Sequence, residues 1–276
     1  MAAGYTLGMA SRTVGQEWQL DPHHASVARV YNYLMGGKDN YAVDREMGDK
    51  LRESSPDIDA TVRVNRAFGA RATRYLARLG ITQFIDLGCG IPTTPPCIHE
   101  VARQEQPDAR VVYVDHDPIV VSYSRALRDR DDGLVSVHAD LAEPELLLDD
   151  PAITAVIDFD RPVALLFISV LQTLPDTGHV TTLMRSYIDR MAPGSHLAIS
   201  HVSADSDDEA IDGVRGASAA TGYPLARFRD DAEILGFFHD LDLVEPGLVD
   251  ISRWRPDPDP VAPTSVLLRG AVGAKR

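Results

Sequence analysis

The chain has 276 residues, 44% of them hydrophobic, which is enough for one large domain or a domain with a small cap. Its net charge of −14 excludes a general nucleic-acid binder, because phosphate backbones are bound by basic side chains. Two cysteines give no disulfide framework or metal site, and no apolar run approaches the ~20 residues of a membrane helix. We therefore expect a cytoplasmic protein with no metal, membrane or nucleic-acid partner.

The first eighty residues are predicted to be helical. Apolar residues recur at helical spacing from Ser26 to Leu34, and Gly36-Gly37 can end that helix. Further helices are predicted over Val43–Leu51 and Asp59–Leu79. Because nothing here alternates like a strand, residues 1–80 are predicted to form a helical N-terminal cap or lid.

From Ile81 onwards, short β-rich runs alternate with helical segments. This alternation predicts parallel strands joined by right-handed crossovers, in a doubly wound Rossmann-like α/β sheet over residues 81–276. No helix fits between the last two runs, Leu241–Val244 and Ser265–Ala271, so these are predicted to pair antiparallel. The other predicted strands are Gln83–Leu87, Arg110–Val114, Leu134–Val137, Val163–Ile168 and Leu197–Ser200. The predicted helices are Pro96–Glu105, Pro118–Arg130, Pro144–Leu148, Thr181–Met191 and Asp230–His239.

The stretch FIDLGCGIPT contains a glycine loop between the first of these strands and the following helix. Gly88 and Gly90 suit a turn that brings the backbone close to a nucleoside cofactor. The third glycine of the dinucleotide fingerprint is absent, and Thr93 stands in its place. Asp86 directly precedes the loop, where a carboxylate would oppose a pyrophosphate but would suit an ammonium or sulfonium group. The loop therefore favours S-adenosylmethionine over NAD.

Two more carboxylates follow the next predicted strands. Asp115 can accept hydrogen bonds from both ribose hydroxyls, which suits either cofactor, and Asp140 can accept one from an adenine amine. Any single Asp at a strand end is often a turn former or a helix cap. The ordered set of Asp86, Asp115 and Asp140 instead indicates an acidic crevice that fits the cationic S-adenosylmethionine.

These motifs resemble those of class I S-adenosylmethionine-dependent methyltransferases. The chain is most similar to an actinobacterial family of S-adenosyl methyltransferases long catalogued as of unknown function. The likeness covers nearly the whole chain. It is carried by FIDLGCGIPT, VVYVDHDPIV and HADL, and by the segments Ala28–Glu46, Val64–Leu76, Pro193–His201 and Leu243–Val249.

The resemblance implies a methyltransferase that uses S-adenosyl-L-methionine. Carried over by position, Asp86 would lie near the ammonium group of the cofactor and Asp115 would bind its ribose. Arg66, on the third predicted helix, is a candidate partner for the cofactor carboxylate, or else an exposed helical Arg. The remaining cofactor-binding candidates are Gly88, Cys89, Gly90, His116, Asp140, Leu141 and Ser169.

Methyl transfer from a sulfonium group requires alignment and exclusion of water, and a base only where the acceptor arrives protonated. His201, after the fifth strand, is a candidate base, or else a hydrogen-bonded loop histidine. Gln172 stands where many relatives carry His, and is a candidate to orient the acceptor or the methyl thioether.

The segment YNYLMGGKDNYAVDRE allows two interpretations. It is either a helix–turn–helix whose glycines supply left-handed backbone, or a lid that closes over the cofactor. The candidate lid and substrate residues are Tyr31, Gly36, Gly37, Lys38 and Tyr41. A later acidic run, Ser203–Asp212, is interpreted as a solvated loop or helix start, with recruitment of a cationic acceptor or a metal as the alternative.

The predicted function is methyl transfer to an unidentified, small-molecule acceptor. One alternative is a non-catalytic protein that binds S-adenosylmethionine or S-adenosylhomocysteine. The other is an NAD-dependent oxidoreductase, which would need the missing third glycine and a hydride-transfer pair that the sequence does not display. The acceptor and the oligomeric state are not specified by these patterns.

Overall fold

The computed structural model describes residues 22–92, 96–128, 131, 133–221, 223, 226–257 and 264–276. Thr93, the position of the missing third glycine, lies outside these residues, as do positions 129 and 130 at the end of the predicted helix Pro118–Arg130. No helix in the described ranges combines the length and apolar character that crossing a membrane requires.

One sheet forms the centre of the described part of the chain, with strand order β3-β2-β1-β4-β5-β8-β6 and β7 paired to β8. The strands β1 to β5 run parallel, and β8 pairs antiparallel with β5, β6 and β7. The predicted α/β class and the antiparallel C-terminal pair are confirmed. The strands are β1 (Gln83–Leu87), β2 (Arg110–Asp115), β3 (Leu134–His138), β4 (Ala164–Ile168), β5 (His196–Val202), β6 (Asp242–Leu243), β7 (Val249–Asp250) and β8 (Leu268–Ala274).

Helices cover both faces of this sheet, as its largely buried strands require. One face packs in a hydrophobic core with α1 to α5 and α9, and the other with α6, α7, α8 and the phenylalanines that follow α10, Phe237 and Phe238. The helices are α1 (Val27–Leu34), α2 (Ala42–Ser54), α3 (Ile58–Arg78), α4 (Ile98–Glu105), α5 (Pro118–Arg128), α6 (Pro144–Leu148), α7 (Pro151–Thr154), α8 (Thr177–Arg190), α9 (Asp208–Thr221) and α10 (Asp231–Gly236). Two 3-10 turns, η1 (Leu171–Thr173) and η2 (Ile251–Arg253), complete the described elements.

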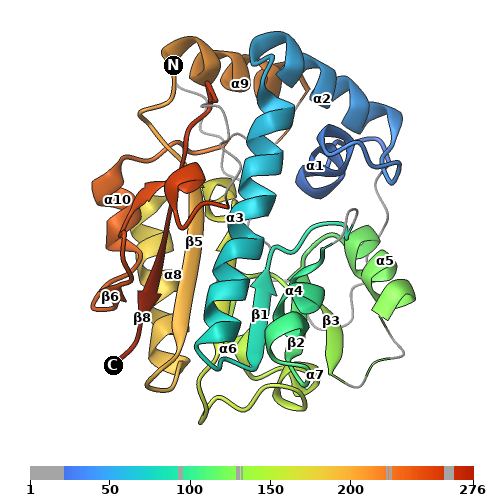
Figure 1. Cartoon of the computed structure of the whole chain (residues 1–276). Helices are drawn as coiled ribbons and strands as arrows, with labels where there is room; N and C mark the ends of the chain where they lie inside the picture. Colours follow the sequence, from blue (N-terminus) through green and yellow to red (C-terminus); the bar gives the residue numbers. More distant parts are fainter. Residues whose placement is uncertain are drawn as a thin grey trace.

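The long helix α3 packs on the sheet, whereas α1 and α2 lie beyond the carboxyl ends of β1 to β3 and above α5 (Figure 1). The helix α9 packs against α2 at the same end of the molecule. This arrangement places the first two helices over the edge of the sheet where the strands β1 to β4 end.

Besides the short elements α7, β7, η1 and η2, which were not predicted, the structure extends the sequence predictions at two further places. The predicted helix Thr181–Met191 begins earlier, at Thr177, because Asp176 caps it by accepting a hydrogen bond from the backbone of His179. The acidic run Ser203–Asp212 leads into α9, and its Asp208 and Glu209 occupy the first turn of that helix, where acidic side chains are favoured. The acidic run is therefore a helix start, and the rest of α9 was not predicted.

Candidate functional site

The glycine loop after β1 has the backbone that its sequence requires. Gly88 and Gly90 have φ angles of 71° and 62°, in the left-handed region that favours glycine. The backbone N–H groups of Gly88 and Cys89 both donate to the carbonyl of Val114, at 2.8 and 3.0 Å. A Cβ at Gly88 would lie 2.3 Å from Val170 Cγ2, whereas a Cβ at Gly90 would meet no atom of the described residues within 4 Å. The loop is thus packed at Gly88 and open at Gly90.

Asp115, at the end of β2, connects this loop to the next one. Its Oδ2 accepts a hydrogen bond from the backbone N–H of Gly90 at 2.9 Å, and its Oδ1 accepts from that of Asp117 at 2.9 Å. The residue is only 5% exposed, and burial raises the pKa of its carboxyl group while these two hydrogen bonds oppose the rise. His116 beside it is exposed, with its Nδ1 3.7 Å from Asp115 Oδ1.

The other predicted carboxylates differ in their exposure. Asp86 is buried at the end of β1, and alternation along paired strands puts its side chain on the same sheet face as that of Asp115. Asp140 is exposed, and its Oδ1 accepts from the backbone N–H of Ala142 at 2.9 Å. Leu141 is buried in the second core. Asp86 and Asp115 are therefore buried carboxylates on one face of the sheet, whereas Asp140 is exposed to solvent.

The segment after β4 is strained and tightly hydrogen-bonded. Ser169 has a φ of 55°, an uncommon conformation for a residue with a side chain. Gln172 Nε2 donates to both the carbonyl and the hydroxyl oxygen of Ser169, each at 2.6 Å. A carbonyl can only accept, so this contact fixes which end of the Gln172 amide is nitrogen. Within the described residues, the buried Oε1 of Gln172 has no hydrogen-bond partner.

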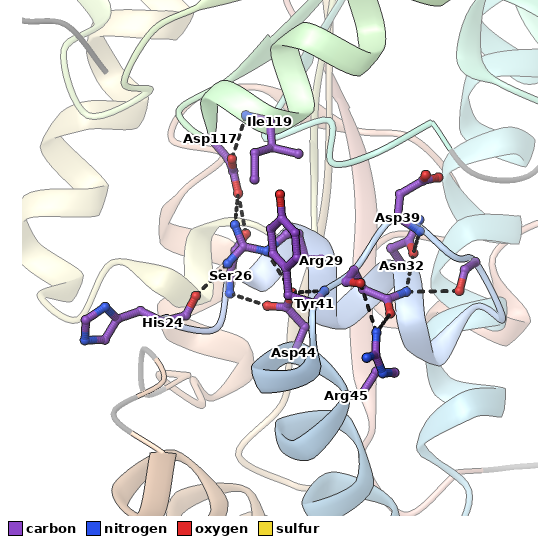
Figure 2. A network of polar contacts seen from close by, with 12 residues as sticks. His24, Ser26, Arg29, Asn32, Asp39, Tyr41, Asp44, Arg45, Asp117 and Ile119 are labelled. Atoms are coloured by element: carbon purple, nitrogen blue, oxygen red, sulfur yellow. Dashed lines mark hydrogen bonds and ion pairs between the residues drawn. The ribbon is translucent and has the colours of Figure 1, made fainter. Parts of the chain in front are cut away.

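A network of buried charges joins the N-terminal helices to the loop after β2 (Figure 2). Arg29 Nε donates to Asp44 Oδ2 at 2.8 Å, and its Nη1 lies 3.5 Å from Asp117 Oδ2. Ser26 Oγ donates to the same oxygen of Asp117 at 2.6 Å. Asp44 is fully buried and also accepts from the backbone N–H groups of Ser26 and Tyr41, at 3.0 and 2.7 Å. These contacts attach the start of α1 to Asp117, which lies two residues after Asp115.

The predicted lid residues divide between packed and exposed positions. The hydroxyl of Tyr31 donates to the carbonyl of Val62 at 2.7 Å, and Asn65 Nδ2 donates to that hydroxyl at 3.2 Å. Gly36 has a φ of 82° and ends α1, as predicted. Gly37 lies against the side chain of Asn32, which a Cβ would approach to 2.6 Å. The exposed members are Gly36, Lys38 and Tyr41, and the ring of Tyr41 lies under the guanidinium of Arg29 at 5.1 Å.

The two remaining predicted residues are Arg66 on α3 and His201 on β5. Arg66 is half-buried on α3, close enough to Tyr31 to influence its pKa, and it forms no ion pair with other described residues. His201 is fully buried on β5, where its Nε2 accepts from Arg229 Nη1 at 2.8 Å and its Nδ1 donates to the carbonyl of Val202 at 2.8 Å. Burial lowers the pKa of His201 to about 4. Because both ring nitrogens are engaged, this geometry argues against His201 as a base.

The sequence analysis did not single out Arg29, Asp44 or Asp117. Their charges are buried together only because three separate segments converge in the fold. The spacing D-H-D at Asp115–Asp117 was the one available signal, since the second carboxylate of such a pair often caps the following helix. Asp117 does accept from the backbone N–H of Ile119 at 2.8 Å, in the first turn of α5.

Comparison with known proteins identifies the family. The S-adenosyl methyltransferase family matches residues 13–276. The chain belongs to this family. A candidate S-adenosyl-L-methionine-dependent methyltransferase from Mycobacteroides abscessus is 29% identical over 167 residues, which is 57% of this chain and 51% of that protein. The match thus spans about half the length of that curated relative.

Two solved structures are similar to this S-adenosyl methyltransferase over almost their whole length. A candidate methyltransferase from Thermobifida fusca is 36% identical, with a TM-score of 0.86 over 92% of this chain and 96% of that one. A DUF574 family protein from Streptomyces avermitilis is 37% identical, with a TM-score of 0.87 over 93% of this chain and 99% of that one. The predicted family is confirmed, and with it the enzyme class and the cofactor that define it.

The residues present fit S-adenosylmethionine. The loop is open at Gly90, directly beside the buried carboxylate of Asp115, and a second carboxylate, Asp86, lies on the same sheet face. These carboxylates offer hydrogen-bond acceptors for hydroxyl and ammonium groups, and their negative charge would oppose a pyrophosphate. No group of three His, Cys, Asp or Glu residues suited to a metal ion occurs in the described part of the chain.

Proposed function

We propose that this protein transfers a methyl group from S-adenosylmethionine to a small-molecule acceptor. The observation that carries the proposal is the position of Asp115, which is buried at the end of β2 and holds the open Gly90 through its Oδ2 at 2.9 Å. Each carboxylate oxygen has a second lone pair beyond the one used in these contacts. Asp115 is therefore equipped to accept hydrogen bonds from a ribose while it keeps the glycine loop in place.

The individual roles are proposed from these positions. Asp86 faces the ammonium group of the cofactor's amino-acid end, and Arg66 faces its carboxylate. A buried carboxylate and a guanidinium that forms no ion pair with the described residues are complementary to those charges. His116, Asp140 and Leu141 border the adenine. Gly88, Cys89 and Ser169 contribute through their backbone, which the carbonyls of Val114 and Ser200 hold in place.

The bound cofactor supplies an electrophilic methyl group on a sulfonium, and the protein aligns the acceptor with it. Residues 1–80 are proposed to act as the cap, of which α1 and α2 cover the carboxyl edge of the sheet. Tyr31, Gly36, Gly37, Lys38 and Tyr41 belong to this cover, which excludes water from the reacting atoms. Gln172 orients the acceptor, and no role as a base is assigned to His201.

The test is calorimetric titration with S-adenosylhomocysteine, S-adenosylmethionine and NAD in parallel. Binding of the first two without the third supports the cofactor site. A labelled methyl product from S-adenosylmethionine and a small-molecule extract then separates an enzyme from a protein that only binds the cofactor. Product formation that is unchanged in Asp115→Ala would contradict the site assignment.

A further inference from the structure

A cavity of about 130 Å³ lies between α1, α3 and α9, beside the segment that follows β4. Most of its wall is apolar, with Val30, Leu34, Val62, Val214 and Phe228 among the lining residues. No charged side chain occurs among the described residues that line it. The polar lining residues are Tyr31, Thr61, Asn65, Ser169, Gln172 and Tyr223.

One lining residue, Gln172, has a buried polar atom without a hydrogen-bond partner in the described residues. Asn65 is satisfied, because its Nδ2 donates to Tyr31 at 3.2 Å and its Oδ1 accepts from Ser200 Oγ at 2.6 Å. Gln172 is 8% exposed, and both hydrogen bonds of its Nε2 go to Ser169. Its Oε1 is buried without a hydrogen-bond partner in the described residues. A buried amide oxygen left unpaired is costly, so a ligand with an N–H or O–H group would gain by meeting it.

The cavity adjoins the proposed cofactor site through the segment from Ser169 to Gln172. Val170 packs on the glycine loop, where a Cβ at Gly88 would lie 2.3 Å from its Cγ2. Its neighbours Ser169 and Gln172 line the cavity. One short segment therefore contacts the glycine loop through Val170 and the cavity through Ser169 and Gln172.

Building on the methyltransferase function proposed above, we propose that this cavity is the acceptor pocket and that it takes a neutral amine on a small apolar body. The N–H of the amine donates to Gln172 Oε1. The volume is close to that of the roughly 150 Å³ apolar cavities that bind benzene, so the body is about one ring in size. A charged acceptor would lose its hydration without meeting an opposite charge in this lining.

The lining also selects the nucleophile. The ionisable groups among the described lining residues are Tyr31 and Tyr223, and burial raises the pKa of both phenols. His201 is engaged with Arg229 and does not line the cavity. A neutral amine needs no base, because its nitrogen lone pair forms the new N–C bond while the S–C bonding pair leaves with sulfur. The resulting ammonium loses its proton to water afterwards.

The experiment compares aniline, which is neutral and carries N–H groups, with toluene, which has none. Each is titrated calorimetrically into the full chain saturated with S-adenosylhomocysteine, as the wild type, Gln172→Met and the surface control Gln104→Met on α4. We expect Gln172→Met to weaken aniline about five- to tenfold, as the loss of one hydrogen bond predicts, and to leave toluene unchanged. Val214→Phe, which fills the cavity, should abolish the binding of both ligands while S-adenosylhomocysteine still binds.

Several results would overturn the proposal. One is an equal loss of binding affinity for aniline and toluene in Gln172→Met. The others are absence of aniline binding to the wild type, and tighter binding of benzoate or benzylammonium than of aniline. Phenol and aniline are also each incubated with the protein and S-adenosylmethionine, and the methylated products are measured by mass spectrometry. Methylation of phenol in preference to aniline would contradict the choice of an amine. Failure of S-adenosylhomocysteine itself to bind would instead contradict the proposed function, and the unliganded protein would then serve for the cavity titrations.

Discussion

Ser26 and Asp117 are 91 residues apart in the chain, yet Ser26 Oγ donates to Asp117 Oδ2 at 2.6 Å. Asp117 in turn donates its backbone N–H to Asp115, which holds Gly90. A continuous series of hydrogen bonds therefore runs from the first turn of α1 to the glycine loop. This series makes the N-terminal helices part of the structure that fixes Asp115, the carboxylate proposed to bind the cofactor.

Removing the charge of Asp44 should destabilise the fold. Asp44→Asn leaves Arg29 buried with its nearest counter-charge lost, and breaking a buried ion pair in this way costs about 3–5 kcal/mol. We expect a drop of about that size in the free energy of unfolding, measured by denaturant titration. Glu46→Gln on the same helix is the control, since its ion pair with Lys50 is exposed and should contribute less than about 0.5 kcal/mol. Equal effects of the two changes would contradict a buried network.

The two loop glycines should respond differently to alanine. Both have positive φ, so each alanine carries a backbone cost of roughly 1–2 kcal/mol. Gly88→Ala must also displace Val170, and should lower the melting temperature more than Gly90→Ala does. Gly90→Ala adds its methyl group to open space, and should chiefly weaken S-adenosylhomocysteine binding. The reverse order of melting temperatures would mean that the loop has another packing.

Arg66 should act only on the amino-acid end of the cofactor. Arg66→Met is expected to weaken S-adenosylhomocysteine about tenfold, as the loss of one charge-assisted hydrogen bond predicts. The same variant should bind 5′-methylthioadenosine, which has no amino-acid end, as tightly as the wild type does. Arg63→Met, an exposed change on the same helix, serves as the control. A loss of affinity for both ligands would show that Arg66 acts through the fold.

His201 should make the stability of the protein depend on pH. Burial lowers its folded pKa to about 4, against an ordinary value of 6.5. Between these values the unfolded chain binds a proton that the folded chain does not, so stability present above pH 6.5 is lost as the pH falls to about 4. The loss approaches roughly 3 kcal/mol, since each pKa unit corresponds to about 1.36 kcal/mol.

The measurement is the free energy of unfolding across this pH range for the wild type, His201→Gln and His179→Gln. His201→Gln should lack this part of the slope, whereas the exposed His179→Gln should keep it. If the wild type and His201→Gln decline in parallel, the buried neutral imidazole is not the cause.

The strands β1 to β5 could be predicted because they are apolar runs buried on both faces, each followed by a helix. The helix α9 could not, since DEAIDGVRGASAAT has few large apolar residues and its position depends on packing against α2. The side chain of His201 shows the same limit. Its neighbour Ser200 hydrogen-bonds Asn65 on α3, so alternation along β5 turns His201 to the opposite face of the sheet. There Arg229, which is distant in the sequence, donates a hydrogen bond to His201 Nε2.

The positions of the carboxylates were readable from the sequence because parallel strands bring their carboxyl ends to one edge. Their surroundings were not readable. Asp115 is the last residue of β2 and is buried, whereas Asp140 lies two residues beyond the end of β3 and is exposed. The contact of Asp115 with Gly90 and that of Asp117 with Ser26 join segments that are far apart in the sequence, so the sequence alone did not indicate them.

The most direct test of the account is calorimetric titration of S-adenosylhomocysteine and NAD into the wild type and Asp115→Asn. We predict that the wild type binds S-adenosylhomocysteine and not NAD, and that Asp115→Asn weakens S-adenosylhomocysteine at least tenfold, because the ribose and Gly90 lose a charged partner. Binding of NAD, or equal affinity of the two proteins for S-adenosylhomocysteine, would contradict the central role assigned to Asp115.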